Sequence, residues 1–345
     1  MRILFVEDEL EKNIPRLRRL FSKYLSKNQN DELKALENDE YGATPEQIKA
    51  IMERKDLFRI EYRFPDALKE IVTNTKKYAL FIIDRNLSLT EYNLEEVQVI
   101  DKNFSESQYN KFFEREGDYF LHKMIYQHID VATRFYFLTA YSFEDEIKGA
   151  EDLKTHVEFK KFGRDNFIEK ASSNDIDRLR NVIENQPAFL IRHDNLEYLE
   201  ILKKRIAENV SDSFWYILVN SNKQDYIQTN LGAIRVLLEN IMRVTAEKLH
   251  APAECWEKEK SIKVRSVLNW LVQYDSENKK NNYQFGTNSI IKDFGYNIYE
   301  IASDFGAHHP ASGFQPTTDT VNALVYALKD IIVWFDSALE KYGEN

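Results

Sequence analysis

The sequence is poor in the residues that build cross-linked, metal-clustered or membrane-spanning structures. Its 345 residues contain a single cysteine, Cys255, so an internal disulfide is excluded and a reducing compartment such as the cytoplasm is expected. No apolar run approaches the roughly 18 residues needed to cross a bilayer. The opening segment meets acid at Glu7 and lacks the long apolar core of a signal peptide. We therefore expect a soluble cytoplasmic protein with no membrane partner.

Acidic residues outnumber basic ones. The chain has 47 Lys and Arg against 57 Asp and Glu, which gives a formal net charge of −10. Because nucleic-acid phosphates are bound by clustered Lys and Arg, this balance argues against a DNA partner. The sequence also has no helix-turn-helix with a basic recognition helix, no Gly-rich nucleotide loop and no zinc pattern. Its length favours two domains, each large enough to close its own core.

Apolar runs and helical periods alternate through the first half of the chain. The runs typical of buried parallel strands are 3–6, 58–62, 78–83, 135–138 and 166–169. The segments between them, such as 10–21 and 65–72, place apolar residues at the spacing of an amphipathic helix. Five strands that alternate with helices predict an α/β fold built on a doubly wound, five-stranded parallel sheet.

Two long segments interrupt this pattern and are predicted to be insertions, at about 26–56 and 88–131. In the first, residues 26–43 are polar and acidic, and we expect a loop. Thr44 then precedes a proline and is followed by Gln47 at the spacing of a capping box, which predicts a short helix. The second insertion is aromatic and charged, and we expect it to be helical.

The second half of the chain has a different pattern, because strand signals fade from about residue 192 and helical periods replace them. Apolar residues recur at helical spacing in 196–206, 234–249 and 321–339. The last of these segments has a start signal around Thr317 and a stop signal at Gly343. We therefore expect a first domain over residues 1–187 and a mainly α-helical domain over residues 188–345.

Polar residues with complementary chemistry follow four of the predicted strands. Glu7 and Asp8 come after the first strand, Asp84 after the third, Thr139 at the end of the fourth and Lys170 after the fifth. In doubly wound sheets the functional site lies outside the carboxyl edge of the strands, so these side chains are expected to meet. Three converging carboxylates repel one another, and a hard cation such as Mg²⁺ relieves that repulsion.

This set contains the parts needed to phosphorylate a carboxylate. The reaction needs a nucleophilic aspartate, a divalent cation and fixed donors for the charge on the phosphoryl group. Asp84 can attack, Lys170 can place its ammonium beside the phosphoryl oxygens, and Thr139 can donate a hydroxyl. These contacts would draw the Thr139 loop inward and open space for Phe167, which is a two-state repacking.

On these residues, the first domain resembles the receiver domain of bacterial two-component response regulators, which has a flavodoxin-like fold. The resemblance implies that Asp84 is the phosphoacceptor and that Glu7, Asp8, Asp84 and the backbone of Asn86 hold Mg²⁺. It also implies that a sensor histidine kinase is the partner that donates the phosphoryl group. The switch hydroxyl, the small residue after it, the switch aromatic and the phosphate-binding lysine would be Thr139, Ala140, Phe167 and Lys170.

The chain departs from the family pattern in three places. Ala171 stands where a proline usually follows the lysine, and the segment 85–89 lacks the usual proline and glycine. The two insertions also make the domain longer than a typical receiver, and the second has the length to cover the phosphorylation cleft or to select the kinase. A degenerate receiver that is not phosphorylated and serves for dimerisation is therefore an alternative.

The helical half carries one weak candidate site. Arg243 and His250 have a spacing similar to the Arg-to-His motif of HEPN-type helical ribonucleases, and His308 is a second histidine that such a site would use. The motif is short, so chance is the simpler interpretation, and the acidic balance argues against RNA. We expect an output domain that works through contacts with a protein partner, with a homodimer as an open option. A receiver-gated ribonuclease is the alternative.

Overall fold

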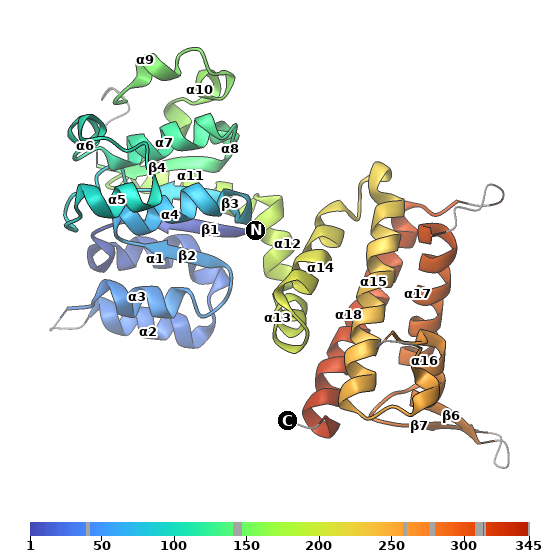
Figure 1. The fold of residues 1–345 in the computed structure, drawn as a ribbon. Coiled ribbons are helices and arrows are strands. Elements are labelled where there is room, and N and C mark those ends of the chain that lie inside the picture. The colour runs from blue at the N-terminus through green and yellow to red at the C-terminus, as the bar shows by residue number, and fades with distance from the viewer. Residues whose placement is uncertain are drawn as a thin grey trace. The chain divides into compact units, whose positions relative to one another are not determined.

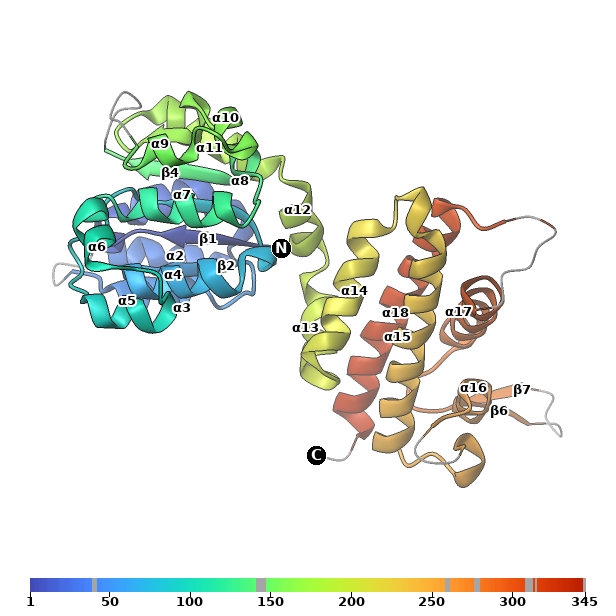
Figure 2. The ribbon, with the colours of Figure 1, turned by 45° about the horizontal axis from the view of Figure 1, so that its top comes forward.

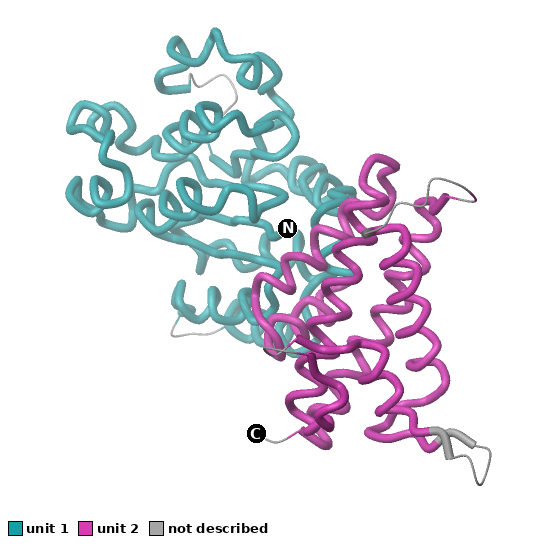
Figure 3. The backbone as a smooth tube through the Cα atoms, turned by 45° about the vertical axis from the view of Figure 1, so that its right-hand side comes forward, with its two compact units in different colours: residues 1–194 teal, residues 195–345 magenta. Residues whose placement is uncertain are grey.

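The computed structural model describes residues 1–38, 42–140, 147–257, 261–275, 280–307, 313 and 315–343. The chain divides into two compact units, Met1–Asp194 and Asn195–Asn345 (Figure 3). We expected the boundary after residue 187, but helix α12 (Pro187–Asp194) is part of the first unit. Arg192 of this helix donates to the carbonyl of Asp56 at 2.7 Å and also pairs with its carboxylate.

Five parallel strands form the centre of the first unit. They are β1 (Arg2–Val6), β2 (Phe58–Glu61), β3 (Tyr78–Ile83), β4 (Phe135–Thr139) and β5 (Phe167–Glu169). Their order in the sheet is β2-β1-β3-β4-β5, and every neighbouring pair is parallel. Figures 1 and 2 show β1, β2 and β4 among the helices of the first unit. All six residues of β3 are buried, which explains why the central strands are continuous apolar runs. The predicted flavodoxin-like sheet is confirmed.

Helices cover both faces of this sheet (Figure 1). Phe5 of β1 packs on Phe21 of α1 (Ile14–Phe21), with ring centroids 6.0 Å apart, and α1 packs beside α11 (Ser173–Glu184). Because side chains alternate along a strand, the neighbouring Leu4 points to the opposite face, where α4 (Phe64–Thr73) and α7 (Glu116–Tyr126) pack together. The remaining helices of the unit are α2 (Lys27–Glu37), α3 (Pro45–Met52), α5 (Leu94–Ile100), α6 (Glu106–Phe112), α8 (Val131–Arg134), α9 (Ala150–Leu153) and α10 (Val157–Lys161).

The first insertion contains a helix, α2, where we expected a loop. Ser26 and Gln29 form a reciprocal capping box at its start, and the Gln29 side chain is buried and donates to the carbonyl of Ile51 at 2.7 Å. The expectation of a loop was therefore wrong, because it rested on polar composition and overlooked the capping pattern. The other capping box, of Thr44 and Gln47 at the start of α3, is confirmed.

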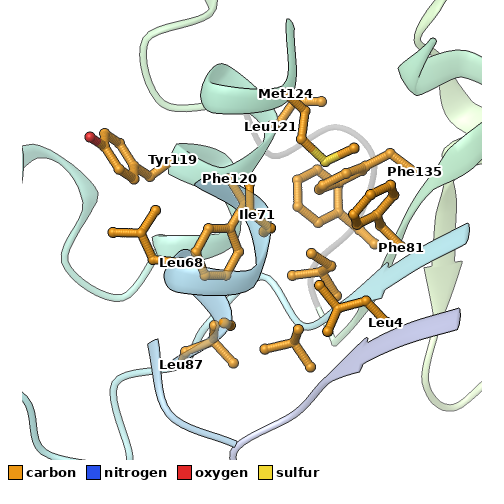
Figure 4. Packing of buried hydrophobic residues seen from close by; sticks show 14 of the residues in the cluster. Leu4, Leu68, Ile71, Phe81, Leu87, Tyr119, Phe120, Leu121, Met124 and Phe135 are labelled. Atoms are coloured by element: carbon orange, nitrogen blue, oxygen red, sulfur yellow. The ribbon is translucent and has the colours of Figure 1, made fainter. Parts of the chain in front are cut away.

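The second insertion is helical, as expected, and its helix α7 is part of the core. Phe120 of α7 stacks on Phe64 of α4 with ring centroids 5.1 Å apart. Leu68 and Ile71 of α4 and Phe81 of β3 belong to the same buried cluster (Figure 4). Burial of these aromatic and aliphatic side chains fixes α7 on the sheet. The position of α7 matters for the site, because its first turn begins next to the end of β3.

The second unit is mainly α-helical. Its elements are α13 (Leu196–Arg205), α14 (Glu208–Asn220), α15 (Ile227–Lys248), α16 (Val264–Leu271), β6 (Val272–Asp275), β7 (Lys280–Tyr283), α17 (Ser289–Ala307) and α18 (Thr318–Tyr342). Helices α15, α17 and α18 pack together through buried side chains such as Leu237, Ile298 and Phe335. The start and stop predicted for the last helix are confirmed by the cap at Thr317 and the C-cap at Gly343. Across the described residues, no helix combines the length and apolar character needed to span a membrane.

Candidate functional site

The carboxyl ends of β1 and β3 bring three carboxylates together. The register pairs Val6 with Ile83, so the next residues, Glu7 and Asp84, leave the sheet side by side. The backbone N–H of Asp84 donates to the carbonyl of Val6 at 2.8 Å, which extends the ladder past the end of β3. Oxygens of Glu7, Asp8 and Asp84 lie within 4.8 Å of one another, and all three side chains are buried. The three acids predicted to meet at this edge of the sheet therefore lie in one cluster.

Lys170 joins this cluster from the end of β5. Its Nζ lies 2.6 Å from Oδ2 of Asp84, and 2.9 and 2.8 Å from the two carboxylate oxygens of Glu7. The backbone N–H of Lys170 donates to the carbonyl of Thr139 at 2.9 Å, so the residue after β5 is fixed against the end of β4. Residues from four separate strand ends thus converge at the carboxyl edge of the sheet.

The charged groups of the cluster change one another's protonation. Burial, followed by the charge of Asp84, raises the pKa of Glu7 well above its usual value. Burial also raises the pKa of Asp8 to about 6, although a hydrogen bond from the N–H of Leu89 opposes this change. For Lys170, burial lowers the pKa, but the carboxylates of Glu7 and Asp84 outweigh burial and leave it raised. Lys170 pairs with only two of the three acids, Glu7 and Asp84, so the cluster favours a further positive charge.

The donor set suits a hard divalent cation. Carboxylate oxygens from three side chains are the ligands that Mg²⁺ takes in proteins, together with retained waters. The loop after β3 orients two of them: the N–H of Leu89 donates to Oδ2 of Asp8 at 2.8 Å, and the N–H of Asn86 donates to Oδ1 of Asp84 at 3.3 Å. The side-chain carbonyl of Asn86 accepts hydrogen bonds from Ser88 within the same loop, which is compatible with the metal-binding role implied for the Asn86 backbone.

The two predicted switch residues lie on the adjacent strands. Thr139 is the last residue of β4 and is fully buried, and Ala140 follows it and is exposed. Phe167, the first residue of β5, is 5% exposed and packs against Phe137 and Phe162, with ring centroids 5.2 and 5.6 Å away. Phe167, the predicted switch aromatic, is therefore inside the core on the face covered by α7.

The residue after Asp84 is buried beside the site, which the sequence did not indicate. Arg85 is fully buried and pairs with Asp118 of α7, with Nε 2.7 Å from Oδ1 and Nη2 3.1 Å from Oδ2. Its guanidinium also lies over the rings of Phe137 and Phe167, at 5.6 and 5.7 Å from their centroids. A charged residue just past a strand normally faces solvent, so the local pattern gave no sign of this burial.

The first turn of α7 holds the loop that follows Asp84. The N–H of Gly117 donates to the carbonyl of Arg85 at 3.1 Å, and the N–H of Leu87 donates to the carboxylate of Glu116 at 3.0 Å. A Cβ atom on Gly117 would lie only 2.7 Å from the carbonyl oxygen of Asp84, so only glycine permits this approach. The isolated glycine in a helical stretch was the sequence signal that could have revealed the contact.

The candidate residues of the second unit form no comparable cluster in the part of the chain that the structure describes. Arg243 on α15 pairs with Glu247 at 3.2 Å and contacts Asn240 at 3.4 Å. His250 lies past the end of α15 with a φ of 56°. A cavity of about 370 Å³ beside Arg243 has no contribution from His250 among its described lining residues. His308 lies outside the described residues.

The chain was compared with models of protein families, with curated proteins and with solved structures. None of these comparisons found a match.

Proposed function

We propose that the first unit is a receiver that takes a phosphoryl group from a sensor histidine kinase onto Asp84, with Mg²⁺ as cofactor. The observation that carries the proposal is the ammonium of Lys170 at 2.6 Å from Asp84 inside a cluster that also holds Glu7 and Asp8. A purely structural ion pair needs one acid for one base. A buried surplus of carboxylates costs stability unless a cation or a reaction makes use of it.

Asp84 is the nucleophile in this proposal. A carboxylate oxygen of Asp84 attacks the phosphorus of a phosphohistidine; the new P–O bond forms while the P–N bond breaks, and its electron pair stays on the imidazole nitrogen, which is protonated by water. Bound Mg²⁺ would supply charge neutralisation for the phosphoryl oxygens. Lys170 already contacts the attacking group, so its ammonium can follow the charge onto the phosphoryl oxygens while Glu7 keeps it oriented. Thr139 is the proposed hydroxyl donor from the end of β4.

For the second unit we propose an output role through contacts with a protein partner. On α15, Arg235 and Arg243 are each paired with a glutamate one turn further along the helix, at 2.9 and 3.2 Å. Pairing of this kind weakens binding to RNA phosphates, which depends on available positive charge. The positions of Arg243 and His250 therefore do not support a receiver-gated ribonuclease. RNA cleavage by the wild type that is lost in His250→Ala would be evidence for that alternative.

Phosphorylation of the full chain by a small donor tests the main proposal. Incubation with acetyl phosphate and Mg²⁺ is expected to add one phosphoryl group, detected by intact-mass spectrometry, and Asp84→Asn or removal of Mg²⁺ should abolish the addition. Asp101→Asn is a matched control, because Asp101 is also a buried acid paired with a lysine, Lys123, but it does not join the cluster. Equal labelling of Asp84→Asn and wild type would remove the assignment.

A further inference from the structure

The buried pair of Arg85 and Asp118 has a geometry that a stability role does not explain. Both side chains are completely inaccessible to solvent. Removing two charges from water costs more than an apolar pair of similar size would, so a buried ion pair is weak evidence for added stability. What the pair supplies is direction, because a guanidinium that binds a carboxylate through two nitrogens is held in one orientation.

This orientation bears directly on Asp84. Arg85 is the next residue in the chain, its side chain is fixed by Asp118, and its carbonyl accepts the N–H of Gly117. With both its side chain and its carbonyl held, the peptide that leads from Asp84 into the loop has little freedom to rotate. The rings of Phe137 on β4 and Phe167 on β5 pack against the guanidinium.

Asp118 also binds the backbone of Lys148, just before α9. Its Oδ2 accepts the backbone N–H of Lys148 at 2.8 Å, and Nε2 of His122, one turn further along α7, lies 2.9 Å from the carbonyl of Lys148. One carboxylate on α7 therefore contacts both Arg85, the residue after Asp84, and the backbone of Lys148.

We propose that Arg85 and Asp118 are positioning residues, which hold the loop after β3 so that the Asp84 carboxylate faces Glu7, Asp8 and Lys170. The expected effect on the rate of phosphorylation rests on the proposed function. The structural part of the inference, the restraint on the loop, is independent of that function. The first turn of α7, which belongs to the second insertion, would then hold the phosphoacceptor in position.

The test uses full-length variants in which the pair is made apolar, Arg85→Met with Asp118→Leu. Apolar replacement of both partners preserves burial without leaving an unpaired charge, so the fold is expected to survive. The matched control is Lys123→Met with Asp101→Asn, a pair that involves the same helix but does not touch the loop. Circular dichroism during urea unfolding checks that each variant is folded.

Two readouts separate positioning from folding. The first is hydrogen exchange at the amides of Asn86 and Leu87, and the second is the rate of phosphorylation by acetyl phosphate at saturating Mg²⁺. We expect faster exchange in the apolar double variant and a fall in the rate of about tenfold or more, since small misplacements of a reacting group cost rate steeply. The control pair should leave both readouts at the wild-type level.

A folded double variant with wild-type exchange and wild-type rate would overturn the inference. If the double variant does not fold, Arg85→Lys, which keeps the buried charge but cannot bind Asp118 through two nitrogens, is judged by the same two readouts and the same criteria. If wild type itself is not phosphorylated, the proposed function fails, while the exchange comparison still decides whether the pair restrains the loop.

Discussion

Replacing Gly117 with alanine tests how closely α7 approaches the phosphoacceptor. The new Cβ would lie 2.7 Å from the carbonyl oxygen of Asp84 and 2.8 Å from Cα of Arg85, whereas ordinary contacts begin at 3.4 Å. Both obstructing atoms are backbone, so α7 or the loop must move. Overpacking of this kind costs about 1–3 kcal/mol. The middle of that range is about 2 kcal/mol, and the better helix propensity of alanine returns up to about 1 kcal/mol, which leaves a net loss of about 1–2 kcal/mol for the first unit.

The assay compares Gly117→Ala with Gly232→Ala, a matched control within α15, where a Cβ would meet no atom within 4 Å. All 4 tryptophans, at positions 215, 256, 270 and 334, belong to the second unit. Urea unfolding followed by tryptophan fluorescence therefore reports the second unit, and circular dichroism reports both. Gly232→Ala should stabilise the second unit by about 0.5–1 kcal/mol. The reasoning is refuted if Gly117→Ala stabilises the first unit in the same way or leaves it unchanged.

Three further predictions concern the site and the first insertion. Lys170→Met leaves Glu7 and Asp84 buried without their ammonium partner. Without Mg²⁺ at pH 8, the free energy of unfolding of the first unit in urea should therefore fall by about 3 kcal/mol, and millimolar Mg²⁺ should recover part of this loss. No loss would contradict the ion-pair assignment. Because burial raises the pKa of Asp8 to about 6, calorimetry should show Mg²⁺ affinity falling as the pH drops through about 6. A pH-independent Mg²⁺ affinity would speak against this site. The stability of the metal-free first unit should change with pH in the opposite direction. Between about pH 6 and the ordinary pKa of 3.8 the folded state binds more protons than the unfolded state, so the contribution of Asp8 to stability should rise as the pH falls. Ser26→Ala removes the cap of α2 and should lower the free energy of unfolding of the first unit by about 1 kcal/mol, whereas an unchanged midpoint would count against the capping box.

The sheet and the acidic cluster were predictable because both follow from local patterns. A parallel strand buried on both faces must be a continuous apolar run, and the polar residue that ends it must lie at the sheet edge. Glu7, Asp84 and Lys170 could therefore be assigned to one edge before any contact was known. The order of the strands then brought them within hydrogen-bond distance.

The loop after Asp84 was not predictable, because its conformation depends on residues that are distant in the sequence. The burial of Arg85 depends on Asp118, which is distant in sequence and belongs to an insertion whose docking on α4 is set by tertiary packing. Nothing within a few residues of Arg85 signals a buried partner. Helix α2 is a milder case, since the capping box of Ser26 and Gln29 was present in the sequence, but a mostly polar helix has a weak apolar periodicity.

Identification of the phosphorylated residue tests the central claim most directly. After incubation of the full chain with acetyl phosphate and Mg²⁺, borohydride reduces an aspartyl phosphate to homoserine, which marks the acceptor for peptide mass spectrometry. The account predicts homoserine at position 84 and nowhere else. A mark at another residue, or no mark in the presence of Mg²⁺, would contradict it.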